Sequence, residues 1–281
     1  MRHLRLLILI LILSLPLVLN ATEVRAQGKN MRVAFVLLSE PRLPKREDVV
    51  RSFSAFATKG QGIKLGKSEA KADSEILEFD LKPNGNAFVM LLPTAVPNGE
   101  ADDAVRFSLS AMGTGWKLPK HNAHLIVTCN TSVAPVESLS LLTSLLAAVV
   151  KASPAVGIYW GPASATHDPK FFLETAQEPD TSFRIMLWTG VSMAREADGR
   201  LSLLSLGMDQ LNLPDLLLVA PKSAGNSALE AFFNLLTYVA NLGKPLPEGD
   251  TVGRSATEKL RVQYVPSPMD QKTKVWRVEI K

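Results

Sequence analysis

The chain has few cysteines and few charges. A single cysteine, Cys129, occurs among 281 residues, which excludes a disulfide scaffold and any disulfide within one chain. Because Cys129 lies in an apolar run, we expect a buried and unreactive thiol. Charged residues make up 21% of the chain, with no dense block of Lys and Arg between aromatics, so no nucleic-acid partner is expected. The 46% of hydrophobic residues excludes a disordered chain and is enough for a large core.

Residues 1–26 have the features of a secretory signal peptide. Two arginines precede an apolar run of 14 residues, Leu6–Leu19, which is shorter than the roughly 20 residues that span a bilayer as a helix. Small residues follow at cleavage positions, near Ala21 or Ala26. We therefore expect a secreted or periplasmic protein. The alternative is an uncleaved leader that anchors the chain, and this is the one membrane contact that the sequence indicates.

The N-terminal half alternates between strand and helix patterns. The predicted order is strand, helix, strand, strand, helix, strand, with residues 58–74 as a loop. The elements are residues 31–38, 45–57, 75–81, 87–92, 98–112 and 124–129. The two strands before and after the turn at 83–86 predict a β-hairpin. The order βαββαβ is that of a ferredoxin-like fold.

The second half mixes helices and strands without a regular βαβ alternation. A long apolar helix begins at Pro135, with Thr131 or Ser132 as its cap, and a short helix begins at Asp168-Pro169. The other predicted elements are a strand at 156–160, a hairpin of 183–191 and 201–206, a strand at 215–219, a helix at 223–242, and strands at 260–265 and 274–280. We predict an α+β fold with mixed or antiparallel sheets. Residues 27–281 form one domain, and a duplicated arrangement of halves 31–130 and 131–281 is compatible with the pattern.

A loop after the predicted strand 156–160 is the first candidate site. Loops at strand ends often carry function. Aromatic rings offer stacking surface, and a histidine changes charge near neutral pH. The candidates are Tyr159, Trp160, Gly161, Ser164 and His167. The alternative is that both aromatic rings pack in the core and that His167 only flanks the next helix.

Two further histidines, His121 and His124, enter the strand 124–129. Their spacing of three on an extended chain predicts opposite faces, which disfavours a shared metal ion. His124 then shares a face with Ile126 and Thr128. No carboxylate pair, phosphate-binding loop or G-x-S-x-G motif is complete. The sequence therefore predicts no metal and no cofactor.

Several segments taken together resemble a known bacterial family, the domain of unknown function DUF4261. They are Phe35–Pro41, Met90–Pro97, His121–Thr128, Gly157–Gly161 with His167, and Gly249–Gly253, in this order. The resemblance covers residues 31–266. It implies no catalytic residue, because the family has no assigned activity, and it directs attention to the loop from Tyr159 to His167 and to His121 and His124.

Two classes of function follow. The first is an exported, non-catalytic binding protein whose partner is another protein, by analogy an immunity-type protein that neutralises a toxin-like partner. The second is a hydrolase or metal-assisted enzyme that uses His121, His124 and His167 with Tyr159. Convergence of the three imidazoles in one pocket favours the enzyme, and their separation favours the binding protein.

Overall fold

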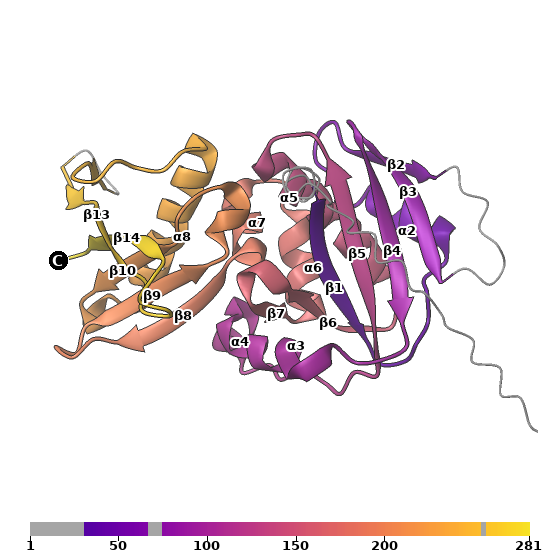
Figure 1. The fold of residues 1–281 in the computed structure, drawn as a ribbon, viewed down its shortest axis with the longest axis horizontal. Coiled ribbons are helices and arrows are strands. Elements are labelled where there is room, and N and C mark those ends of the chain that lie inside the picture. The colour runs from indigo at the N-terminus through magenta and orange to yellow at the C-terminus, as the bar shows by residue number, and fades with distance from the viewer. Residues whose placement is uncertain (1–30, 67–74, 254–256) are drawn as a thin grey trace, which may run out of the picture.

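The protein has an α+β fold, built from a seven-stranded and a five-stranded sheet with helices between and beside them (Figure 1). The computed structural model describes residues 31–66, 75–253 and 257–281. The predicted signal peptide and part of the predicted loop 58–74 lie outside these residues. No helix in the described residues is both long and apolar enough to cross a membrane.

The first sheet has the strand order β2-β3-β4-β5-β1-β6-β7, and neighbouring strands are antiparallel. The strands are β1 (Met31–Leu38), β2 (Gly62–Leu65), β3 (Ile76–Lys82), β4 (Gly85–Leu92), β5 (Ala123–Thr131), β6 (Ala155–Trp160) and β7 (Ala165–His167). The predicted hairpin is confirmed as β3 and β4. Strand β2 corrects the prediction of a loop there: its short sequence, GIKL, pairs with the edge of β3.

The ferredoxin-like order is not confirmed, because β5 separates β4 from β1. A split β-α-β unit is nevertheless present later in the chain. Strands β5 and β6 are both antiparallel to β1, so they run parallel to each other with β1 between them. Helix α5 (Pro135–Lys151) connects them.

Helices α2 (Arg46–Phe53), α5 and α6 (Pro169–Gln177) cover the inner face of the first sheet, and α7 (Thr181–Trp188) packs against α5 and α6. Helix α5 is apolar almost all round and is buried, as a central core helix should be. Its N-cap is Ala134, without a side-chain cap. Thr131 is in β5 instead, where its hydroxyl donates to the Asn84 carbonyl at 2.7 Å.

Helix α7 corrects the predicted strand 183–191. The largely apolar run FRIMLW predicts a strand by composition, but a short apolar run is equally compatible with a buried helix. Asp180 starts this helix, because its carboxylate accepts a hydrogen bond from the Ser182 amide at 2.7 Å. Helix α6 was predicted correctly, with Asp168 as the N-cap and proline in the first turn.

Arg184 connects its own helix, α7, to α5, to α6 and to the turn that follows α2. Its guanidinium is almost fully buried and donates six hydrogen bonds, all to neutral acceptors. These are the carbonyls of Phe56, Ser140, Ala176 and Glu178 and the hydroxyls of Ser140 and Ser144, at 2.6–3.1 Å. Burial lowers the pKa of Arg184 to about 10, so it remains charged at neutral pH.

The predicted helix 98–112 is broken into short turns: η1 (Pro97–Gly99), α3 (Glu100–Asp103), η2 (Ala104–Phe107) and α4 (Leu109–Thr114). Ser108 interrupts the helix with extended backbone angles. This segment covers the outer face of the first sheet near β6 and β7, where Val96, Ala101 and Ala104 form a small apolar cluster with Leu37 and Tyr159.

The second sheet has the order β13-β14-β10-β9-β8, in which β10 and β14 are parallel. Its strands are β8 (Gly190–Arg195), β9 (Leu201–Leu206), β10 (Leu216–Ala220), β13 (Gln263–Pro266) and β14 (Lys274–Glu279). Helix α8 (Gly225–Leu242) packs against it, and η3 (Gly161–Ala163), η4 (Met208–Leu211), η5 (Lys222–Ala224), β11 (Thr251–Val252) and β12 (Leu260–Arg261) complete the elements. The two sheets differ in strand number and order, so their topology does not support a duplication.

Candidate functional site

The candidate loop at the end of β6 lies at the junction of the two sheets. Trp160 is fully buried, and its indole N–H donates to the side-chain oxygen of Gln210 at 2.8 Å. The Gln210 amide donates in turn to the carbonyls of Trp188 and Gly207, at 3.1 and 2.9 Å. Trp160 therefore holds the two sheets together, as the alternative of core packing predicts.

Gly161 and Ser164 belong to the same junction. Gly161 begins η3, and Ser164 ends it with a positive φ of 49°. The second sheet approaches this turn so closely that a Cβ on Gly190 would lie 2.1 Å from the Ala163 carbonyl oxygen. Only glycine fits at that approach.

Replacing Gly190 by alanine is therefore expected to lower the free energy of unfolding by about 1–3 kcal/mol, as overpacking of a closed junction does. Chemical denaturation measures this change. Gly113→Ala is the matched control, because Gly113 is exposed in α4 and a Cβ there meets nothing within 4 Å. Equal stability of the two variants would contradict a tight junction.

His167 lies in the interior with a serine that the sequence analysis did not identify. Its Nε2 donates to the Leu187 carbonyl at 3.0 Å, so its Nδ1 accepts from the Ser108 hydroxyl at 3.0 Å. A serine, a histidine base and an orienting oxygen resemble a nucleophilic site. Both side chains, however, are fully buried, so no substrate reaches them. No sequence motif connects Ser108 with His167, which are brought together only by the packing of β7 on the broken helix.

The buried environment of His167 also determines its charge. Burial lowers the pKa of His167 to about 4, against a smaller opposing effect of the hydrogen bond with Leu187. The imidazole is neutral at physiological pH.

A second buried titratable group, Asp215, lies beside the second sheet. Its carboxylate accepts hydrogen bonds from the Ser205 hydroxyl at 2.7 Å and the Met208 amide at 3.1 Å. Burial raises the pKa of Asp215 to about 6 in spite of these bonds.

His121, His124 and Tyr159 lie together at the edge of the covered part of the outer face. Nδ1 of His124 donates to the Thr94 carbonyl at 2.7 Å, and Nε2 of His121 accepts from the Val96 amide at 3.4 Å. The prediction of opposite faces is wrong because His121 precedes β5, so strand alternation does not apply to it. Both imidazoles hold the same segment, residues 94–96, against the sheet.

Aromatic rings extend this group along the outer face. Phe35 stacks on Tyr159, with ring centroids 5.6 Å apart, and meets His124 edge-on at 5.9 Å. Burial, and then the neighbouring Glu100 carboxylate, raise the pKa of Tyr159 above its ordinary value. Burial lowers the pKa of His124; the Thr94 hydrogen bond opposes this effect and His121 adds to it.

The three histidines do not converge, because His167 is in the interior and the other two hold the outer segment. No group of metal-binding side chains occurs among the residues that the structure describes. Cys129 is confirmed as a buried thiol, and burial raises its pKa to about 12.

The outer face of the first sheet is open beyond this group. We call the open face the side chains that share this side of the five strands β1 to β5: Met31, Val33, Phe35, Lys64, Ile76, Glu78, Asp80, Asn86, Phe88, Met90, Ile126, Thr128 and Asn130. Helices α2 and α5 lie on the opposite side (Figure 1). Three of these apolar side chains are exposed, Met31 by 52%, Ile76 by 44% and Phe88 by 37%.

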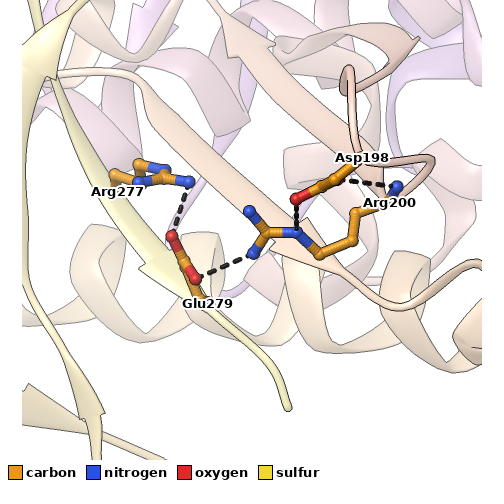
Figure 2. Close-up of polar contacts among 4 residues, drawn as sticks. All are labelled: Asp198, Arg200, Arg277 and Glu279. Carbon is orange, nitrogen blue, oxygen red and sulfur yellow. Dashed lines mark hydrogen bonds and ion pairs between the residues drawn. The ribbon is translucent and has the colours of Figure 1, made fainter.

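The second sheet carries a row of charges instead. Figure 2 shows Arg200 between Asp198 and Glu279, at 2.7 and 2.8 Å, and Arg277 on the other oxygen of Glu279 at 2.5 Å. These ion pairs join the β8–β9 turn to the last strand. The charges are compensated within the row, so it does not indicate a site for a charged ligand.

Comparison with known proteins supports the predicted family, over the C-terminal part of the chain, which contains one of the five segments, Gly249–Gly253. The model of a domain of unknown function (DUF4261) matches residues 204–279, from the end of β9 through β10 and α8 to β14. No curated protein and no solved structure matches the chain. The family description names no activity, so the site residues rest on the geometry alone.

Proposed function

We propose that this chain is an exported, non-catalytic binding protein that holds a protein partner on the open face. The observation that carries the proposal is the exposure of Met31, Ile76 and Phe88 on one face of a sheet whose other face is packed. Ile76 and Phe88 lie diagonally beside each other on adjacent strands, and Met31 lies on β1, beyond Thr128 and Asn130 of β5. Exposed apolar patches mark interaction sites. Phenylalanine and methionine are also enriched in protein interfaces.

The polar group beside the open face suits the border of an interface. Tyr159, His124 and Glu100 place a hydroxyl, an imidazole and a carboxylate next to Phe35. Polar side chains at an interface rim give hydrogen bonds and specificity. An enzyme has less support, because His121 and His124 are separated from the sealed His167.

Export rests on the leader. Two arginines, an apolar run and small residues at Ala21 and Ala26 are the three parts of a secretory signal peptide. A partner outside the cytoplasm follows from this proposal.

A photo-crosslinking experiment tests both parts. With p-benzoylphenylalanine in place of Phe88, irradiation of producing cells is expected to give a covalent adduct of discrete mass, on a chain shortened by its leader. The same amino acid in place of Met193, which is 50% exposed on β8, is the control and should give no such adduct. Equal labelling from both positions would contradict a binding role of the open face. An intact leader would contradict export.

A further inference from the structure

The open face has a composition that changes row by row along the strands. Side chains directly opposite each other on neighbouring strands form one row. The first row is apolar throughout: Ile76, Met90, Ile126 and Phe35. The third row is polar on four strands, with Lys64, Asp80, Asn86 and Asn130, and ends in Met31 on β1. The row between them contains Glu78, Phe88, Thr128 and Val33.

From these rows we infer that the open face binds a second copy of the same chain, about a two-fold axis that runs along β4, parallel to the strands. The inference rests on the proposed function of the open face as a binding surface. An axis in this direction sends every row onto itself, so an apolar row meets an apolar row and a polar row meets a polar row. It also keeps the strands of the two sheets aligned, as in face-to-face sheet packing.

Along β3, β4 and β5 the pairs that this axis creates are complementary, whereas at the margin Met31 on β1 meets the partner's Lys64 on β2. Because β4 faces itself, β3 of one copy faces β5 of the other. Ile76 meets the partner's Ile126, and Phe88 meets the partner's Phe88 at the axis. Asp80 then accepts a hydrogen bond from the amide of the partner's Asn130, and Glu78 accepts one from the hydroxyl of the partner's Thr128.

The covered part of the outer face explains why the axis follows β4. The segment with α3 and η2 stands on β6 and β7, the third and fourth strands from β4 on one side. On the other side the sheet ends at β2, the second strand from β4. The partner's covering segment therefore passes outside the edge of the sheet. With an axis along β5, the partner's covering segment would instead lie against β2 and block the contact of the two faces.

The size of the face predicts a weak and reversible dimer. Five strands at a spacing of about 4.8 Å make it about 24 Å wide, and about six residues at 3.3 Å make it about 20 Å long. Each copy then buries about 500 Å², or about 1,000 Å² in total, near the lower limit of specific interfaces. A dissociation constant on the order of micromolar follows, since small interfaces form transient complexes.

A charge-swap experiment tests the register of the dimer. In sedimentation velocity over a concentration series, the purified protein is expected to show a monomer–dimer equilibrium. Asn130→Asp should weaken it roughly tenfold, because the new carboxylate faces the partner's Asp80. The double variant Asp80→Asn with Asn130→Asp should restore it. Asp80 and Asn130 are separated by β4 within one chain, so rescue reports a contact between copies.

Two more variants complete the test. Phe88→Asp should abolish the dimer, and Met193→Asp, at an exposed site of the second sheet, should leave it unchanged. A protein that is monomeric throughout, or a dimer that Phe88→Asp does not affect, overturns the second copy as the occupant. If the chain is monomeric but position 88 crosslinks to a different polypeptide, the binding function stands and only the occupant is wrong. A monomeric chain without any adduct overturns both.

Discussion

Replacing Arg184 by leucine is expected to lower the free energy of unfolding by about 4 kcal/mol. The guanidinium is almost fully buried, and its N–H groups donate six hydrogen bonds to α5, to the C-terminal end of α6 and to the turn after α2. Leucine fills part of the space but leaves the buried carbonyls of Phe56 and Ala176 without these donors, and each unsatisfied group costs about 1–3 kcal/mol. Urea denaturation measures the loss.

Two other variants separate the hydrogen bonds of Arg184 from its bulk. Arg184→Lys keeps the charge but has three donors on one atom, so it should lose less stability than the leucine variant. Arg195→Leu replaces an exposed arginine at the end of β8 and is expected to change stability by less than about 0.5 kcal/mol. If Arg184→Leu lowers the free energy of unfolding by less than about 1 kcal/mol, the hydrogen bonds of Arg184 do not stabilise the packing of these helices.

The second large effect is a pair of opposite pH dependences in one pH range. The pKa of His167 falls from 6.5 to about 4 on folding, so its contribution to stability is full above pH 6.5 and is lost as the pH falls through about 4. The pKa of Asp215 rises from 3.8 to about 6 on folding, so its contribution is full below pH 3.8 and is lost as the pH rises through about 6. Each shift corresponds to about 3 kcal/mol.

Because the two contributions have opposite signs, the native protein should show little net pH dependence from them between pH 4 and 6. Asp215→Asn retains the acceptor oxygen for Ser205 but does not titrate. Its free energy of unfolding should therefore rise by about 3 kcal/mol from pH 4 to pH 6.5. His167→Gln retains an acceptor and a donor, and its stability should fall over the same range.

Denaturation curves at several pH values measure how the free energy of unfolding of each variant changes with pH. In the double variant this free energy should again be nearly independent of pH between pH 4 and 6. Identical pH profiles for the native protein and both single variants would contradict the shifted pKa values. Chemical denaturation at a fixed salt concentration keeps the contribution of the exposed carboxylates to the pH dependence the same in all variants.

The elements with a long or regular apolar pattern could be predicted from the sequence. The bounds of β1 and α5 agree with the prediction because a run of strand-forming residues and a largely apolar 17-residue helix that begins with proline leave few alternatives. The run 183–191 could not be assigned by periodicity, although Asp180 was available as a helix-start signal. Sheet order depends on contacts between distant segments, so the position of β5 beside β1 was not predictable from local pattern.

The candidate site was predicted only in part. Tyr159 reaches the outer face with His121 and His124, whereas Trp160 and His167 are interior. Strand alternation already separates Tyr159 from Trp160, so this difference was present in the sequence. The open face was not predictable, because the pattern of β3 and β4 does not show which side the helices leave uncovered.

Strand β1 is synthesised first but completes its pairing late. Both of its neighbours, β5 and β6, are encoded far downstream, and Phe35 pairs with Ile126 on one side and Tyr159 on the other. Contacts between distant residues require loop closure before they stabilise the chain, which slows folding. The pairing of β1 with β5 therefore needs residues up to 131, and its second pairing, with β6, needs residues up to 160. If the leader directs export as proposed, this late completion of the first sheet favours a chain that is still unfolded when it is transported.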